Sequence, residues 1–145
     1  MKQFTFTLQP LYDMQENIEK QYKMQISEIE AELSRRLSDL EVLNGNFSRM
    51  RNEYCSAVES GMQAVRVKEY GHFFDRLKAV IVLVQEKIVH LEKEKEQCLA
   101  KLIQARREKK LLDRVRESQY KQYMDDYKKD QDKKVDDLVS YRASV

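Results

Sequence analysis

The sequence predicts an all-α protein: a long antiparallel two-helix coiled-coil hairpin with a C-terminal single-helix overhang. The 145 residues include only one proline and three glycines, so the chain has very few of the turn-forming residues that a compact globule needs. Charged residues make up 36% of the chain, which is typical of long helices. Both halves carry apolar residues at helical spacing, with a short turn between them. We expect one coiled-coil domain over 1–145, with a first helix over about 8–60, a turn over about 61–66 and a second helix over about 67–141.

The first helix is predicted from one apolar stripe. Between Ile18 and Leu40 its steps of 4, 4 and 3 make an 11-residue repeat, which predicts nearly straight or slightly right-handed winding. Glycine at position 45 lies inside the stripe, but the stripe crosses it in phase, so we expect the helix to continue there with a weak point. The members are Leu11, Met14, Ile18, Tyr22, Ile26, Ile29, Leu33, Leu37, Leu40, Leu43, Phe47, Met50, Tyr54 and Val58.

The start of the chain alternates apolar and polar residues like a short strand from Phe4 to Leu11. Helical spacing then takes over. Thr7 is a plausible N-cap, which places Pro10 in the first turn, where its missing N–H is harmless.

The second helix is predicted from a regular heptad seam that carries two lysines. A turn near Ser60-Gly61-Met62-Gln63 allows both stripes to be buried by folding back as a hairpin. The second arm is longer, so its end should be a single helix with the N-terminus beside its base. The seam consists of Leu77, Ile81, Val84, Ile88, Leu91, Lys95, Cys98, Leu102, Ala105, Lys109 and Leu112.

Charge is distributed unevenly along the chain. Residues 1–60 hold 7 basic and 10 acidic residues, whereas residues 101–145 hold 13 and 9. An acidic arm beside a basic arm favours mutual pairing over nucleic-acid binding. The basic residues over 106–116 could touch phosphate or acidic lipid, but acids interleave with them, which favours a solvated helix face.

Catalytic and metal-binding patterns are missing from the sequence. His72 and His90 have no ligand spacing, and there is no phosphate loop or nucleophile with a neighbouring base. Cys55 and Cys98 should sit at different heights of the hairpin, so we expect free thiols. We therefore expect no enzyme, no cofactor and no metal. Without a secretory signal or a long apolar run, we expect the cytoplasm.

Six consecutive apolar residues from Ala79 to Val84 cover every face of a helix, whereas a two-helix seam buries one stripe. Together with Phe47, Met50 and Tyr54 opposite, they predict an apolar patch near the turn that binds a partner. The alternative is self-association, or bundling by an extra turn of helix.

The C-terminal overhang carries a sparse apolar stripe with no partner in the hairpin. Charged residues around it give many i,i+3 and i,i+4 pairs. The overhang is either a protruding end that docks in a receptor or a fraying charged helix. The stripe consists of Tyr120, Tyr123, Tyr127, Val135, Leu138 and Tyr141.

Several residues, in this order and spacing, resemble the family of the flagellar export protein FliJ over nearly the whole chain. The residues that carry the resemblance are Phe4, Phe6, Leu8, Leu11, Glu16 and Glu19 at the start, Asn52-Glu53-Tyr54 before the turn, Tyr70, Phe73 and Leu77 after it, and Arg107-Glu108-Lys109-Lys110 with Leu111 and Leu112.

The resemblance implies a non-enzymatic stalk of the flagellar type III export apparatus, similar to the central stalk of rotary ATP synthases. It implies docking of the paired termini in a hexameric FliI-like export ATPase, contact of the turn region with an FlhA-like export gate, and assistance to flagellar export chaperones. The stalk would then be peripheral at the cytoplasmic face of the cell membrane. The implied gate-binding residues are Phe73, Leu77, Tyr54, Val80 and Tyr70, and the nominated ATPase-binding residues are Phe4, Phe6, Leu8, Leu11, Tyr120, Tyr123 and Tyr127.

Two other functions stay open at this point. One is the equivalent stalk of a virulence-type secretion system, which neighbouring genes would distinguish. The other is a free-standing export chaperone, whose apolar patch would bind many unfolded peptides and which would not recognise the ATPase.

Overall fold

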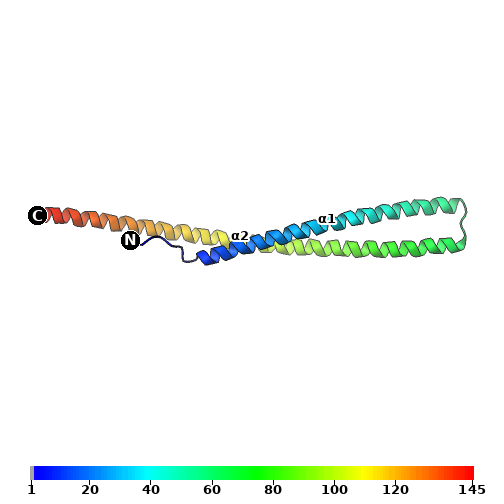
Figure 1. Cartoon of the computed structure of the whole chain (residues 1–145), viewed down its shortest axis with the longest axis horizontal. Helices are drawn as coiled ribbons and strands as arrows, with labels where there is room; N and C mark the ends of the chain where they lie inside the picture. The colour runs from blue at the N-terminus through cyan, green and yellow to red at the C-terminus, as the bar shows by residue number, and fades with distance from the viewer. Residues whose placement is uncertain (1) are drawn as a thin grey trace. The chain divides into compact units, whose positions relative to one another are not determined.

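A computed structural model describes residues 2–145. These residues form two helices, α1 (Gln9–Glu59) and α2 (Ala64–Ser144). The predicted all-α hairpin of two long, packed helices is confirmed (Figure 1). The second helix begins at Ala64, earlier than the predicted start near Val67, and α1 runs without a break through Gly45, as expected.

The chain divides into two compact units, and each contains a stretch of both helices. The turn unit comprises Tyr22–Ala100 and includes the connection between the helices. The terminal unit comprises Met1–Gln21 with Lys101–Val145. Within each unit the two helical stretches run antiparallel, since the chain reverses once between them.

The core of the turn unit is a narrow seam. Leu33 from α1 packs with Ile88 and Leu91 from α2, and Ile29, Leu40 and Val84 flank this cluster. Along α2 the side chains that are not fully exposed recur at steps of 4 and 3, as the heptad seam predicts. Burial is therefore confined to one stripe of each helix, and most other positions face solvent.

The predicted 11-residue repeat in α1 is wrong at one step. Leu37 is 52% exposed, whereas Arg36 is half-buried and donates a hydrogen bond from Nε to Glu32 Oε1 at 2.9 Å. With Arg36 in place of Leu37, the steps from Ile29 to Leu43 alternate between 4 and 3, and so match the heptad of α2. An arginine can take such a position because its stem covers the seam while its guanidinium reaches the edge.

A glycine ends α1 and opens the turn. Gly61 has φ of 91°, a left-handed conformation that other residues rarely adopt. Its N–H donates to the Val58 carbonyl at 3.1 Å, a bond typical of the residue that follows a helix C-terminus. The Gln63 carbonyl then accepts the first bond of α2, from Val67 N–H at 3.2 Å.

The N-terminal segment is extended but is not a strand, because it pairs with no other strand among residues 2–145. Its alternation has a different cause: Phe4, Phe6 and Leu8 are half-buried, whereas Thr5 and Thr7 are exposed.

The cap of α1 differs by one residue from the prediction. The Leu8 carbonyl accepts the first helical bond, from Tyr12 N–H at 3.1 Å, so Leu8 rather than Thr7 occupies the cap position. Pro10 lies in the first turn, as predicted.

Candidate functional site

An aromatic cluster joins α1 and α2 in the turn unit. Phe74 is at its centre, with ring centroids 5.4 Å from Phe47, 5.9 Å from Tyr54 and 6.4 Å from Tyr70. Tyr54 and Tyr70 also contact each other at 5.3 Å. Two of the predicted gate-binding residues, Tyr54 and Tyr70, therefore contribute ring packing that holds the helices together near the turn.

Phe74 was missed by the sequence analysis, although a signal was present. Residues 70, 74 and 77 continue the 4 and 3 steps of the α2 seam toward the turn. Extending the seam backward from Leu77 would therefore have placed Phe74 inward and its neighbour Phe73 outward.

A shallow apolar hollow lies beside this cluster. It is lined by Phe73, Arg76, Leu77 and Val80, so three of the predicted gate-binding residues come together. Phe73 is 40% exposed and Val80 44% exposed, whereas Leu77 is half-buried in the seam. A phenylalanine and a valine held open on one helix face are available to a partner in a way that seam residues are not.

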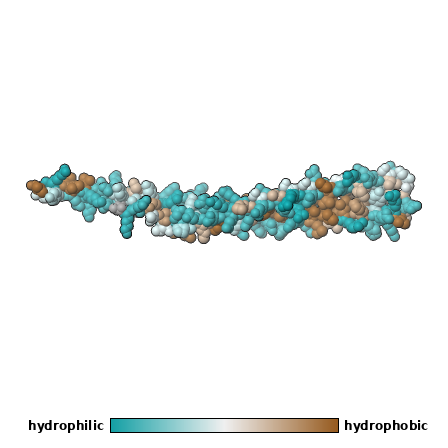
Figure 2. All heavy atoms as spheres, in the orientation of Figure 1, coloured by the Kyte–Doolittle hydropathy of each residue, from teal (hydrophilic) through white to brown (hydrophobic). Residues whose placement is uncertain are grey.

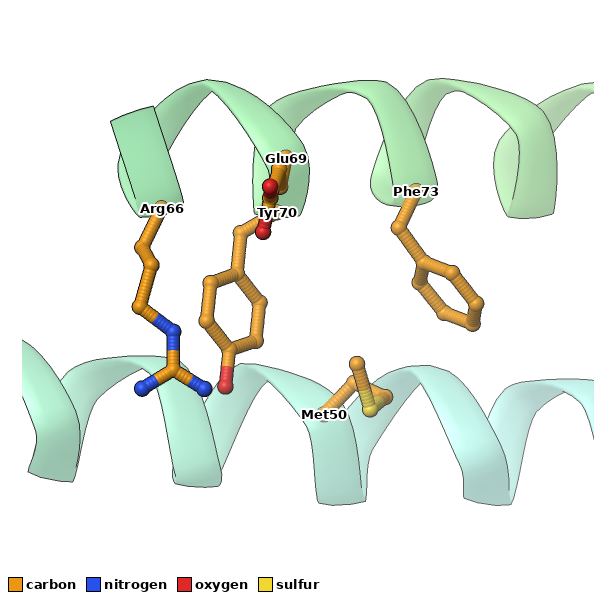
Figure 3. A pocket seen from close by; sticks show the side chains of 5 residues that line it. All are labelled: Met50, Arg66, Glu69, Tyr70 and Phe73. Carbon is orange, nitrogen blue, oxygen red and sulfur yellow. The ribbon is translucent and has the colours of Figure 1, made fainter. Parts of the chain in front are cut away.

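A second hollow lies on the turn side of Phe73. Its lining consists of Met50, Arg66, Glu69, Tyr70 and Phe73. Figure 3 shows Arg66, Tyr70 and Phe73 reaching from α2 toward α1, with Met50 of α1 between the two rings. Phe73 therefore borders both hollows, which makes it the residue that joins them into one surface.

The apolar segment over 79–84 is exposed in part, as predicted from its composition. Ile81 and Val84 lie in the seam and are half-buried. Val82 and Leu83 point away from it, and Leu83 is 64% exposed. Figure 2 shows hydrophobic residues gathered in the turn unit rather than spread evenly along it. The exposed part of the predicted apolar patch therefore lies on α2, whereas Phe47 and Tyr54, which were expected to belong to it, pack inward against Phe74.

A second aromatic cluster lies in the terminal unit. The Phe4 ring is 5.2 Å from Tyr120 and 5.5 Å from Tyr123. Tyr123 stacks in turn on Tyr127 at 6.4 Å. The expectation that Tyr120 and Tyr123 have no partner in the hairpin is therefore wrong, because the extended N-terminal segment supplies Phe4.

The other nominated ATPase-binding residues have mixed exposure. Phe6 and Leu8 are half-buried, whereas Leu11 is largely exposed, because Tyr12 takes the inward position. Phe4 and Tyr120 also line a small hollow with Arg116 and Glu117. Further along α2 every residue of 131–145 is exposed, so the end of this helix packs on nothing in its unit.

A buried carboxylate holds the terminal unit together. Glu19 is only 8% exposed and accepts hydrogen bonds from Arg106 Nε at 3.2 Å and Lys109 Nζ at 3.1 Å. The hydrogen bond to Glu19 raises the pKa of Lys109, although its burial acts in the opposite direction. Tyr12 lies beside the same group, with the Lys109 nitrogen 5.6 Å from its ring centroid and the Arg116 guanidinium 5.4 Å from it.

The other seam lysine, Lys95, pairs with Glu30 at 3.3 Å in the turn unit. Lys95 and Lys109 thus each have an acidic partner on α1. These pairs bear out the expected pairing of an acidic arm with a basic arm. The inward position of Glu19 was not expected from sequence, because the acid belongs to no apolar stripe.

The histidines and cysteines form no catalytic or metal-binding arrangement within residues 2–145. His90 pairs with Glu94 on its own helix at 2.9 Å, and His72 is exposed. No group of three potential ligands comes together in this part of the chain. Both cysteines are free, and the Cys98 thiol faces the Gln25 amide oxygen at 3.6 Å. Neither α1 nor α2 has a stretch long and apolar enough to cross a membrane, over the same residues.

Comparison with known proteins agrees with the resemblance found in the sequence. The family model described as "Flagellar FliJ protein" matches residues 4–145. No curated protein and no solved structure matches the chain. The family match covers both helices and both aromatic clusters, and the chain therefore belongs to the flagellar FliJ family.

Proposed function

We infer that this chain is a component of the flagellar export apparatus, because it belongs to the flagellar FliJ family, whose members are structural export components and are not known as enzymes. We propose that this chain is a non-enzymatic stalk that couples a FliI-like export ATPase to an FlhA-like export gate and assists export chaperones. The turn surface, which is formed by Phe73, Leu77 and Val80 with Tyr70 and Tyr54 beneath it, would bind the gate. The terminal cluster around Phe4 and Tyr120 would bind the ATPase.

The observation that carries this proposal is the hollow at Phe73. In a two-helix seam, aromatic and aliphatic residues are normally used to hold the helices together. Here Phe73 and Val80 remain open to solvent while neighbouring Phe74 does the packing. An exposed apolar surface of this kind, on a chain that has no catalytic arrangement among residues 2–145, supports binding to another protein.

The test is co-elution of the purified chain with the export ATPase and with the cytoplasmic region of the gate. Phe73→Ala with Leu77→Ala should weaken gate binding by about tenfold or more, because truncating a central aromatic anchor commonly costs about 2 kcal/mol. Leu83→Ala is the matched control, since Leu83 is exposed on the same helix but lines neither hollow. Circular dichroism should show unchanged helix content in both variants.

Three results would count against the proposal. Unchanged gate binding in the double variant would contradict the assignment of the turn surface. Unchanged ATPase activation after removal of residues 121–145 would contradict the assignment of the terminal end. Binding of many unrelated unfolded peptides, without any recognition of the ATPase, would favour the free-standing chaperone instead.

A further inference from the structure

The two hollows beside Phe73 share a combination of chemistry that says what should fill them. Each is lined by apolar side chains and by one arginine: Arg76 with Leu77 and Val80 in the first hollow, and Arg66 with Met50 in the second. Apolar lining favours an aliphatic or aromatic side chain, and a guanidinium beside it favours a carboxylate.

Neither arginine has its charge satisfied within residues 2–145. Arg66 and Arg76 take part in no ion pair and no side-chain hydrogen bond there. By contrast, Arg36 and Arg116 each pair with an acid on their own helix. Glu69 shares the second hollow with Arg66 but does not pair with it, so its negative charge weakens the preference for an acid there. The first hollow contains no acid, which makes Arg76 the stronger anchor.

The spacing of the lining residues defines the shape of the occupant. Phe73, Leu77 and Val80 follow steps of 4 and 3, so they form one stripe along α2 that a partner helix can pack against at a similar period. Arg66 and Val80 are 14 residues apart along the helix, which is about 21 Å. A helix of about 14 residues would therefore cover both hollows.

We propose that the occupant is an amphipathic helix of a partner protein that places apolar side chains on either side of Phe73 and carboxylates against Arg76 and Arg66. This inference rests on the proposed function in one respect: the export gate is the first protein in which to look for such a helix. The chemistry of the hollows is independent of that identity.

A second copy of this chain fits the same surface poorly. In an antiparallel two-fold contact of α2 centred on Phe73, Arg76 would meet Tyr70 and Arg66 would meet Val80. In a parallel contact, each arginine would approach its own copy, and like charges would repel. The acid that the antiparallel contact brings nearest to Arg76 is Glu69, which would meet Leu77 but lies beside Arg66 of its own chain. A different, acidic chain can supply a carboxylate to each arginine and therefore satisfies the surface better.

The first experiment uses a displayed library of 16-residue helical peptides, selected on the full chain and counter-selected on Phe73→Ala. The selected peptides should carry apolar residues at i, i+3 or i+4, and i+7, with Asp or Glu beside them. Replacing those acids by Asn or Gln should weaken binding by about five- to twentyfold, and Arg76→Gln should remove the difference. Peptides without acidic enrichment, or no selected peptides at all, would overturn the inference. So would a dimer of the chain that Phe73→Ala disrupts.

The second experiment separates this inference from the proposed function. Binding of the cytoplasmic region of the gate is measured with Arg76→Glu, with Arg76→Lys, and with Arg51→Glu as a control on an exposed arginine outside both hollows. Arg76→Glu should weaken binding by about five- to twentyfold, with Arg76→Lys close to wild type. If Phe73→Ala weakens gate binding and Arg76→Glu does not, the inference is wrong and the proposed function stands. If the gate does not bind at all while acidic helices are selected from the library, the function is wrong and the inference stands.

Discussion

Glu19 gives the sharpest test of how the terminal unit is held together. The substitution Glu19→Gln keeps the shape of the side chain and one hydrogen-bond acceptor but removes the negative charge. In the native chain that charge is almost fully buried and receives hydrogen bonds from two cations, at 3.2 and 3.1 Å. We expect the variant to fold with the same helices and to lose stability in the terminal unit.

The size of the loss follows from what each partner can recover. A hydrogen bond to a charged group contributes roughly 1.5–3 kcal/mol, so two would suggest about 3–6 kcal/mol. Both Arg106 and Lys109 are partly exposed, however, so water replaces much of what they lose. The remaining acceptor of glutamine also keeps one bond. We therefore expect a cost of about 1–3 kcal/mol.

Hydrogen exchange measured by mass spectrometry can localise this effect. A loss of about 1–3 kcal/mol corresponds to opening that is roughly 5 to 150 times more frequent in the helical segments around Glu19 and Lys109. Amides near the seam cluster of Leu33 and Ile88 should change much less, since they lie in the other unit. The matched control is Glu16→Gln, whose partly exposed pair with Lys20 on the same helix is 4.0 Å long and should contribute at most about 0.5 kcal/mol. Glu16 is also the smallest of the causes that raise the pKa of Lys109, so its effect on that group should be minor.

The pH dependence of this effect has a definite sign. Because the pKa of Lys109 is raised in the folded chain, its pairing stabilises the fold fully below the ordinary lysine value of 10.5. That contribution is lost as the pH rises through the higher folded value. The difference between wild type and Glu19→Gln should therefore be constant from neutral pH to about 10 and shrink above it. If Glu19→Gln costs no more than Glu16→Gln at neutral pH, the buried carboxylate does not stabilise the unit and the reasoning is wrong.

Two further predictions concern the glycines and the N-terminal segment. Gly45→Ala should raise the free energy of unfolding by about 0.5–1 kcal/mol, because the position is helical and nothing lies within 4 Å of an added Cβ. Gly61→Ala should lower it by about 1 kcal/mol or more, because φ is 91° at that position. Thermal circular dichroism measures both changes, and changes of the same sign would contradict the assignment of Gly45 to a helix and Gly61 to a left-handed turn. Phe4→Ala should release the N-terminal segment from Tyr120 and Tyr123 at a cost of about 1–2 kcal/mol, seen as faster exchange of its amides, while Thr5→Ala, which changes an exposed residue, should not.

Much of the fold could be predicted from sequence because helical periodicity is a local property. The steps of 4 and 3 along α2 identify its inward residues from Leu77 to Leu112 without any knowledge of α1. Glycine at position 61 predicts the turn, since few other residues adopt a left-handed conformation. Partial exposure of residues 79–84 could also be predicted, because six consecutive apolar residues cover every face of a helix and one seam buries only one face.

The binding surfaces were predicted less completely. Phe73, Leu77 and Val80 were nominated through the resemblance to a family, and the structure brings them together in one hollow. Arg76, which lines the same hollow, was not nominated, because an exposed arginine has no distinguishing pattern in a chain that is 36% charged. Arg76 matters for binding because its guanidinium has no ion-pair partner within residues 2–145, whereas Arg36 and Arg116 each have one. Which side chains pair is visible only in the three-dimensional structure.

What the sequence by itself determined about this protein is the pair of helices, the seam of α2, the position of the turn and the family. Only the tertiary structure decided which α1 residues face that seam and what the chain ends contact. Arg36 replaces Leu37 in the seam, Glu19 is buried beside Lys109, and the ring of Phe4 packs against that of Tyr120. Positions 36 and 37 differ by about 100° around the helix, and either can face inward until a partner helix sets the register. The contacts of Glu19 and Phe4 join residues far apart in the chain, so no local pattern contains them.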